Sequence, residues 1–167
     1  FKEVFNKFYQ SSLRFLSFRP RSEKEIINFI WIKLKKRKVE EPEKIINQLI
    51  KRLKDENLVN DEEFVRWWLD QRHDFNPKGK IILKYELKQK GIAAELIQKA
   101  LDNITSIDQS SQAQKIIQNK ARLYHRLDRN NLKKKLLEHL IRRGFEFELA
   151  KAQVDDFLQK SYNMSKK

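Results

Sequence analysis

Apolar residues recur at helical spacing along most of the chain, and the alternation typical of strands is absent. The clearest stripes are Ile26, Ile30 and Leu34, and then Ile46, Leu49, Ile50 and Leu53. The sequence contains only 3 Gly and 3 Pro, so it offers few places for tight turns. We therefore predict an all-α chain of about eight helices with no sheet.

Capping residues predict where the helices of the N-terminal half begin. A first helix carries Phe5, Phe8, Leu13 and Leu16 on roughly one face. Ser22 followed by Glu25 is a capping box, which predicts a helix over 22–38. Pro42 suits the first turn of the next helix. Asn60 or Asp61 is predicted to cap a further helix, whose apolar face includes Phe64, Trp67 and Trp68. We interpret these aromatic residues and Trp31 as packing residues rather than as base-stacking ones.

Proline and glycine residues predict where the helices of the C-terminal half end. Pro77 and Gly79 mark the clearest break in the chain. Gly91 and Gly144 are expected at positive φ, each ending a helix as its C′ residue. We predict a polar loop from residue 105, with Ser110 or Ser111 capping the next helix, and a frayed tail over 161–167. Asp128 or Asn130 is predicted to start the helix over 132–143. The predicted helices are 80–90, 93–104, 113–127, 132–143 and 146–160.

A helix–glycine–helix unit occurs twice, 53 residues apart. Leu87, Lys90, Gly91, Ile92, Glu95, Leu96 and Leu101 match Leu140, Arg143, Gly144, Phe145, Glu148, Leu149 and Val154. A weaker third copy lies upstream, with Leu34 in the place of Leu87 and Lys38 in the place of Gly91. A single hairpin cannot bury its apolar stripe, so the units are expected to stack, with Leu87 and Leu140 in the core and Tyr85 and Tyr124 between repeats.

This pattern predicts an elongated array of tandem three-helix repeats. The expected divisions are an N-terminal helix over 1–18, a first repeat over 19–75, a second over 76–127, and a third of two helices plus a tail over 128–167.

Four segments in order resemble the RecX family of recombination regulators. They are FRPRSEKEI (18–26), LVNDEEFVRWWLDQR (58–72), KGKIILKYELKQKGIAAELIQKAL (78–101) and LLEHLIRRGFEFELAKAQV (136–154). The resemblance covers roughly residues 12–160. The chain departs from the family pattern at the first hairpin, where residues 28–38 lengthen the helix and no glycine ends it.

The resemblance implies a fold and a partner. RecX-like proteins are arrays of three three-helix repeats that bind the RecA recombinase, mainly as a filament on single-stranded DNA and in the groove of that filament. They inhibit strand exchange and ATP hydrolysis and promote filament loss. We accordingly expect a monomeric, cytoplasmic regulator without enzymatic activity or cofactor.

The net charge of the chain indicates the chemical class of its partner. Lys and Arg number 37 against 23 Asp and Glu, for a net charge of +14. Such a charge indicates a polyanionic partner, which is nucleic acid or less often an anionic membrane. No apolar run is long enough to span a membrane. The charge alone therefore also supports an alternative, a sequence-nonspecific nucleic-acid binder with no recombinase partner, and a structural adaptor that docks only protein is a third hypothesis.

The basic residues gather toward equivalent helix ends, which predicts a basic stripe along one side of the stacked repeats. Stacking would align these ends into a surface able to follow a phosphate backbone or an acidic filament groove. The alternative is a solvated face that merely complements the helix dipoles. The predicted filament- or DNA-binding residues are Lys36, Arg37, Lys80, Lys84, Lys88, Lys90, Lys133, Lys134, Arg142 and Arg143.

Catalytic and metal-binding patterns find little support in the sequence. The chain has no cysteine, which excludes disulfides and thiolate metal sites. His73, His125 and His139 are isolated, without the spacing of a helical zinc site. The acids at 61–63 and 155–156 fit helix caps or solvated faces better than a Mg²⁺ site. The sequence begins at Phe1 rather than Met, and we expect it to be trimmed.

Overall fold

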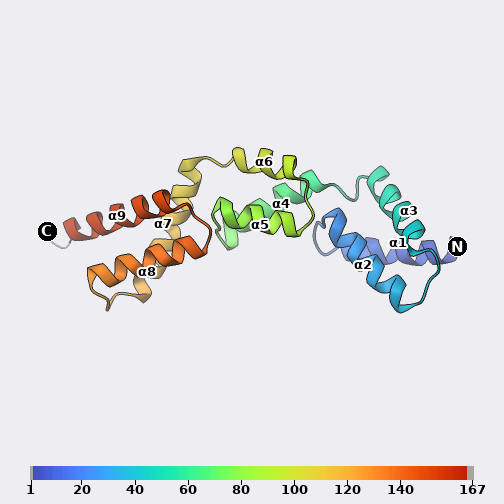
Figure 1. Ribbon diagram of the computed structural model, residues 1–167, viewed down its shortest axis with the longest axis horizontal. Helices are drawn as coiled ribbons and strands as arrows, with labels where there is room; N and C mark the ends of the chain where they lie inside the picture. The colour runs from blue at the N-terminus through green and yellow to red at the C-terminus, as the bar shows by residue number, and fades with distance from the viewer. Residues whose placement is uncertain (1, 165–167) are drawn as a thin grey trace. The chain divides into compact units, whose positions relative to one another are not determined.

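The computed structural model describes residues 2–164, and this part of the chain folds into nine α-helices without a strand (Figure 1). The all-α prediction is confirmed, with one helix more than the eight expected. The helices are α1 (Lys2–Leu16), α2 (Glu23–Lys36), α3 (Pro42–Asp55), α4 (Asp61–Phe75), α5 (Lys80–Gln89), α6 (Ala94–Asp102), α7 (Ser106–Leu123), α8 (Arg129–Arg142) and α9 (Phe147–Met164).

Most predicted helix starts are confirmed by side-chain caps. Ser22 and Glu25 form the predicted capping box at the start of α2. The Asn60 side chain accepts from the N–H groups of Glu62 and Glu63 at the start of α4. Asp128 accepts from the N–H groups of two residues in the first turn of α8.

The predicted loop from residue 105 is wrong, because α7 begins at Ser106. Thr105 and Asp108 form a capping box there, so the first turn is already satisfied before Ser110. Gln109 and Gln112 are buried, so the polar stretch is one face of a packed helix rather than a loop. At the other end α9 continues to Met164, beyond the helix predicted to end at residue 160. Residues 165–167 of the predicted tail lie outside the described residues.

All three hairpin turns share one backbone geometry. Gly91 and Gly144 have φ values of 77° and 85°, as predicted, and Lys38 at the equivalent place has φ 52°. In each turn the N–H of the following residue donates to the carbonyl five residues earlier, at 3.2 or 3.3 Å. The weaker upstream copy is therefore the same turn, formed at a conformational cost by a residue with a Cβ.

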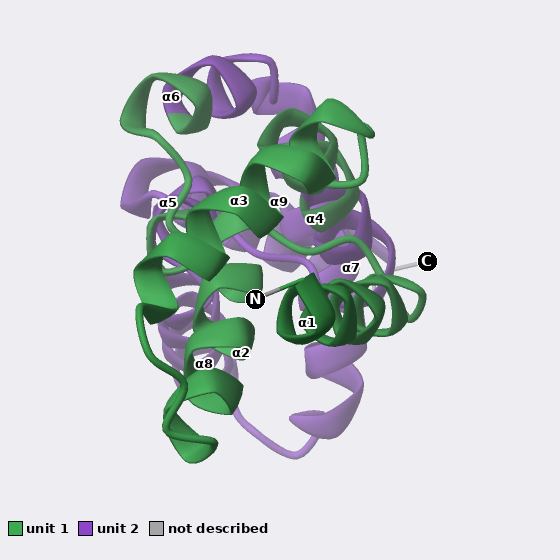
Figure 2. Ribbon diagram, turned by 90° about the vertical axis from the view of Figure 1, so that its right-hand side faces the viewer, with its two compact units in different colours: residues 1–68, 87–97 green, residues 69–86, 98–167 purple. Residues whose placement is uncertain are grey.

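The chain divides into two compact units, and the boundaries fall inside helices (Figure 2). One unit comprises residues 1–68 and 87–97, and the other comprises 69–86 and 98–167. The core of the first unit joins α1, α2 and α3 around buried residues such as Phe8, Ile30 and Leu49. The core of the second unit joins α7, α8 and α9 around residues such as Ile117, Leu140 and Val154.

These cores bear on the predicted organisation. The helix assigned to a segment over 1–18 packs against α2 and α3, with Phe8 and Tyr9 in their common core. Leu87 and Leu140 are both 0% exposed, as predicted for the repeated core position.

Candidate functional site

The N-terminus of α2 meets residues from later helices at a contact that we call the first junction (Ser22, Glu23, Glu25, Asp61 and Lys90). The Ser22 hydroxyl donates to the Lys90 carbonyl at 2.8 Å. The Glu23 N–H donates to the Asp61 carboxylate at 2.9 Å. Burial raises the pKa of Asp61, and the bond from the Glu23 N–H opposes that shift. At the start of α2, the Glu23 N–H is thus satisfied by a group distant in sequence, whereas the Glu25 N–H is satisfied locally by the Ser22 hydroxyl.

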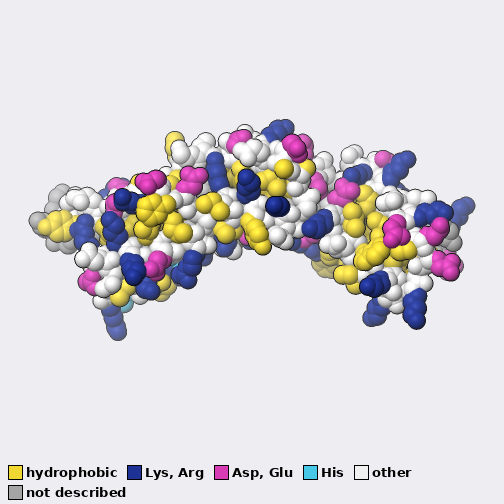
Figure 3. Space-filling view, viewed as in Figure 1, with side chains coloured by type: hydrophobic (Ala, Val, Ile, Leu, Met, Phe, Trp, Pro, Cys, Tyr) yellow, Lys and Arg dark blue, Asp and Glu magenta, His cyan; other side chains and the backbone are white. Residues whose placement is uncertain are grey.

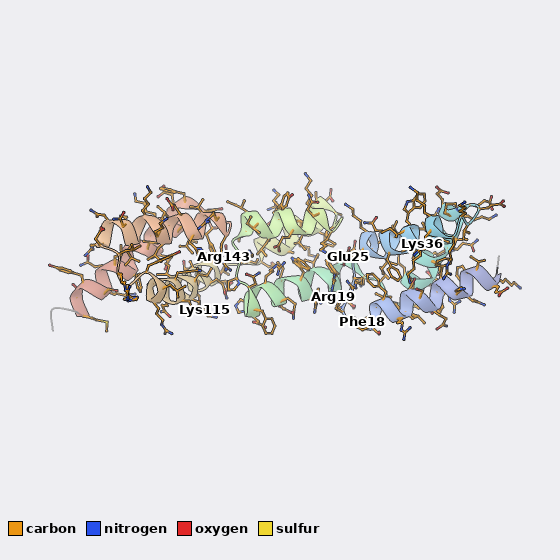
Figure 4. The ribbon with its side chains drawn as sticks, turned by 90° about the horizontal axis from the view of Figure 1, so that it is seen from below. Phe18, Arg19, Glu25, Lys36, Lys115 and Arg143 are labelled. Carbon is orange, nitrogen blue, oxygen red and sulfur yellow. The ribbon has the colours of Figure 1, made fainter. Side chains whose placement is uncertain are left out.

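Glu25 is the electrostatic centre of the first junction. Its carboxylate accepts from Arg19 at 2.8 Å (Figure 4). It also accepts from the Lys90 ammonium at 2.7 Å. Burial alone would raise the pKa of Glu25, but these two hydrogen bonds outweigh it and lower the pKa to about 2. The Arg19 guanidinium lies 5.4 Å from the ring centroid of Trp67, and the Lys90 ammonium lies 5.0 Å from that of Trp68.

A second junction, in the other unit, is formed by Gly79, Lys80, Gln109, Arg143 and Gly144. The Gly79 N–H donates to the Arg143 carbonyl at 2.8 Å, and the Lys80 N–H donates to the Gln109 side-chain oxygen at 3.1 Å. A Cβ on Gly79 would lie 2.0 Å from the Gly144 carbonyl oxygen. The glycine at position 79 is therefore required by the close approach of two backbones.

The Arg143 side chain also belongs to the second junction (Figure 4). Its guanidinium donates to the Asn76 side chain at 2.8 Å and to the Pro77 carbonyl at 3.1 Å. Arg143 thus holds the loop that precedes α5, while its own carbonyl holds Gly79. The motif segments that resemble the RecX family include residues of both junctions, so part of that pattern reflects packing.

Four of the ten predicted binding residues are occupied by contacts within the protein. Lys90 and Arg143 hold the junctions. Lys133 pairs with Asp155 at 2.6 Å, and Arg37 lies 5.5 Å from the ring centroid of Phe8. These side chains can reach a partner only by giving up an internal contact. The sequence could not show this, because their partners are distant in the chain or on another helix.

The other six predicted residues are more available. Lys36, Lys84, Lys88, Lys134 and Arg142 are exposed and Lys80 is half-buried, and within residues 2–164 none of them takes part in an ion pair. Figure 3 shows many Lys and Arg side chains at the surface. These six residues form the candidate binding surfaces, and their union into one stripe across the repeats stays a prediction.

Sequence analysis missed the basic surroundings of His139, which it treated as isolated. Burial lowers the pKa of His139 to about 4, and the positive charges of Lys120, Arg143 and Arg142 act in the same direction. The imidazole is therefore neutral near pH 7. The sequence signal for this neighbourhood was the helical spacing of His139 and Arg142, three residues apart on α8.

Residues 2–164 contain neither a cluster of metal ligands nor a membrane-spanning helix. Within residues 2–164, no group of three or more His, Asp or Glu side chains could hold a metal ion. Among the same residues, no helix combines the length and apolarity needed to cross a bilayer.

Comparisons with known proteins identify the chain's relatives. Residues 60–101 match the family model for the second three-helix domain of RecX, and residues 108–153 match that for the third. The matched spans begin at α4 and α7. The predicted repeats begin one helix later, at residues 76 and 128, because each predicted start was set by a similar hairpin, α5–α6 or α8–α9.

Similar whole proteins carry the same family name. "Regulatory protein RecX" of Bacillus subtilis (strain 168) is 33% identical over 149 residues, covering 89% of this chain and 54% of that protein. The protein of the same name from Streptococcus agalactiae serotype III (strain NEM316) is 32% identical over 145 residues, covering 86% of this chain and 53% of the relative. The chain thus spans about half the length of the curated relatives it matches.

Solved structures show the same fold. The crystal structure of RecX from Lactobacillus salivarius matches with a TM-score of 0.77 and 23% identity, over 93% of this chain and 97% of that one. A second crystal structure, of a regulatory protein RecX, matches with a TM-score of 0.74 and 26% identity, over 90% of this chain and 71% of that one. The fold of tandem three-helix repeats is thereby confirmed. Since the two matched family spans together take in more than half of the sequence, this chain belongs to the RecX family.

Proposed function

We propose that this chain is a non-enzymatic regulator that binds the RecA recombinase filament on single-stranded DNA and inhibits strand exchange, ATP hydrolysis and filament growth. The observation that carries the proposal is the match of residues 60–101 and 108–153 to two successive RecX domains. The relatives are named regulatory proteins, which favours a binding role over catalysis. The RecX-like motifs supply the expectation that the regulated partner is RecA.

The charge distribution supports a polyanionic partner of this kind. Lys84 and Lys88 on α5 and Lys134 and Arg142 on α8 are exposed cations without an ion-pair partner in the described residues. The free-energy cost is small when a partner's carboxylate or phosphate replaces the water around an unpaired surface cation. The second helices of the last two three-helix groups are therefore the surfaces proposed to reach the filament.

The primary experiment compares binding to single-stranded DNA with and without a RecA coat. We expect the chain to bind the coated strand much more tightly than the bare one and to slow strand exchange and ATP hydrolysis at matching concentrations. Equal affinity for both would contradict the proposal. That outcome would favour the sequence-nonspecific nucleic-acid binder, which the net charge of +14 supports by itself.

Two variants with the same change in charge at different positions test the binding surface. In the first variant Lys84, Lys88, Lys134 and Arg142 are replaced with Glu. In the matched control the replaced residues are Lys7, Lys51, Lys99 and Lys151, which are exposed on α1, α3, α6 and α9. We expect the first variant to lose filament binding and the control to retain most of it. If phosphates are contacted directly, the salt slope should fall by about 0.7 per contact removed.

A further inference from the structure

The outer face of α5 exposes two large apolar side chains. Ile81 is 57% exposed and Tyr85 is 61% exposed, although Tyr85 was expected to lie between repeats. The two residues are four apart on one helix, so their side chains share a face and form a continuous apolar strip. Contiguous exposed apolar side chains of this kind are a feature of interaction surfaces, whereas isolated ones need no explanation.

Cations lie on the same face, and acids do not. Lys84 and Lys88 are exposed and follow Ile81 and Tyr85 by three residues each. The one acid of α5, Glu86, is turned to Arg72, with a 2.7 Å ion pair and a side chain only 19% exposed. The outer face of α5 (Ile81, Lys84, Tyr85 and Lys88) is thus apolar and positive.

The equivalent position of α8 is built differently. Glu138 stands where Tyr85 stands, and it faces Lys135 at 4.0 Å. Lys134 stands at the place of Ile81, and Ile141, at the place of Lys88, is 41% exposed, so the equivalent α8 face mixes both charges with one exposed apolar side chain. In α2 the equivalents of Lys84, Tyr85 and Lys88 are Trp31, Ile32 and Lys35, and Trp31 and Ile32 are 40% and 66% exposed. Trp31 was expected to pack. Because Asn28 stands where Ile81 stands, α2 exposes apolar side chains beside a lysine but lacks the apolar pair four residues apart that α5 has.

We infer that the outer face of α5 docks on a protein surface, namely an apolar patch bordered by carboxylates, rather than on a phosphate backbone. This inference rests on the proposed function, in which that surface belongs to a recombinase protomer. A nucleic acid would engage the lysines through its phosphates and could stack a base on Tyr85, but it would leave Ile81, which has no ring, in water. A protein patch would bury Ile81 and Tyr85 and pair Lys84 and Lys88 at its rim, as an interface with an apolar centre requires.

The test separates the apolar pair from the basic pair. One variant carries Ile81→Ser and Tyr85→Ser, and a second carries Lys84→Gln and Lys88→Gln. A matched control carries Ile107→Ser and Leu123→Ser on α7, where the native side chains are 79% and 68% exposed. Each is titrated at several salt concentrations onto RecA-coated single-stranded DNA and onto bare single-stranded DNA, after its circular dichroism spectrum shows intact helices.

We expect the apolar variant to weaken filament binding by about tenfold or more, with an unchanged salt slope and unchanged binding to bare DNA. The basic variant should weaken binding and flatten the salt slope, and the control should bind like the wild type. Full filament affinity of the apolar variant, with wild-type inhibition intact, would overturn this inference and leave the proposed function standing. An equal loss on bare DNA would assign the face to nucleic acid and overturn it as well. A wild-type chain that ignores the filament would overturn the proposed function and this inference together.

Discussion

The two junctions have the same geometry but are stabilised by different chemistry. In each, the N-terminus of a second helix receives a side-chain oxygen from a later helix, Asp61 in one and Gln109 in the other. In each, the carbonyl of the basic residue before the hairpin glycine accepts a hydrogen bond, at Lys90 and at Arg143. The donor to this carbonyl is the Ser22 hydroxyl in one junction and the Gly79 N–H in the other, so corresponding contacts are made by different groups.

The difference lies three residues into the second helix. The first junction has Glu25 there, between Arg19 and Lys90. The second junction has Ile82, whose backbone and side chain lie so close to Gly144 that a Cβ on that glycine would meet them within 2.8 Å. The first junction is thus stabilised by charge and is sensitive to pH, and the second by close backbone packing and is sensitive to added volume.

The largest expected effect treats both regions alike. Leu87→Asp and Leu140→Asp each place a carboxylate at a core position that is 0% exposed. We expect each to cost several kcal/mol, on the order of 4, because the buried charge has no partner. Urea unfolding measures this cost. An unchanged midpoint in either variant would contradict the assigned core.

Gly79→Ala should damage the second junction next most strongly. The added Cβ would meet the Gly144 carbonyl oxygen at 2.0 Å, and backbone atoms cannot rotate away. We expect a loss of about 3 kcal/mol in the free energy of unfolding. Amide hydrogen exchange should locate the damage near 76–82 and 143–145. Equal exchange in the variant and the wild type would show that the two backbones separate easily.

Acidification should weaken the first junction selectively. The pKa of Glu25 is lowered to about 2 from an ordinary value near 4.5, so its contribution is complete above about pH 4.5 and is lost as the pH falls toward 2. The expected loss is about 2 kcal/mol after solvent screening. Glu25→Gln should remove this pH dependence in urea unfolding between pH 5 and 2. The hypothesis fails if the variant and the wild type keep parallel pH profiles.

The hairpin glycines should differ from each other. Gly91→Ala places a Cβ 2.5 Å from Lys24 Cδ, which can rotate away, and 2.7 Å from Lys24 Cβ, which can move only with its helix. The strain of an alanine at positive φ adds about 1 kcal/mol. Gly144→Ala meets the Ile82 backbone nitrogen at 2.6 Å, which cannot move freely. We expect Gly144→Ala to cost more than Gly91→Ala, measured by thermal melting. The reverse order would remove the distinction between the two junctions.

The smallest expected effect is an increase in stability. Lys38 has φ 52°, and Lys38→Gly would give the first hairpin the residue that the other two have. We expect stabilisation by about 0.5 kcal/mol, since glycine adopts this conformation without a Cβ clash. Differential scanning calorimetry of this variant beside Lys36→Gly, a control inside α2, would measure it. A lower melting temperature for Lys38→Gly than for the wild type would contradict the shared turn.

Local signals in the sequence were sufficient for most of the fold. The capping box at Ser22, the caps at Asn60 and Asp128, and the positive φ of Gly91 and Gly144 depend on residues within a few positions, so they could be predicted from short stretches. The exception was the stretch from residue 105, where serines favoured a loop. The Thr105–Asp108 box and the burial of Gln109 made it a helix instead.

The candidate site was less accessible to sequence analysis. Lys84 and Lys90 look alike as basic residues on one predicted helix, but Lys84 is exposed, whereas Lys90 donates to Glu25, 65 residues away. Tyr85 resembled a packing residue and is 61% exposed. These differences depend on which helix face meets a neighbour, and helical spacing alone does not supply that information.

The sequence by itself determined the helices, their caps, the repeated hairpin and the positive charge, because each follows from local backbone chemistry or from composition. Tertiary structure alone decided which cations remain available. Arg143 is committed to Asn76 and Pro77, and Lys90 to Glu25, because stacked helix ends bring these groups together across long stretches of chain. A lysine's charge is fixed by its type, but its availability to a partner is fixed by the residues that the fold places beside it.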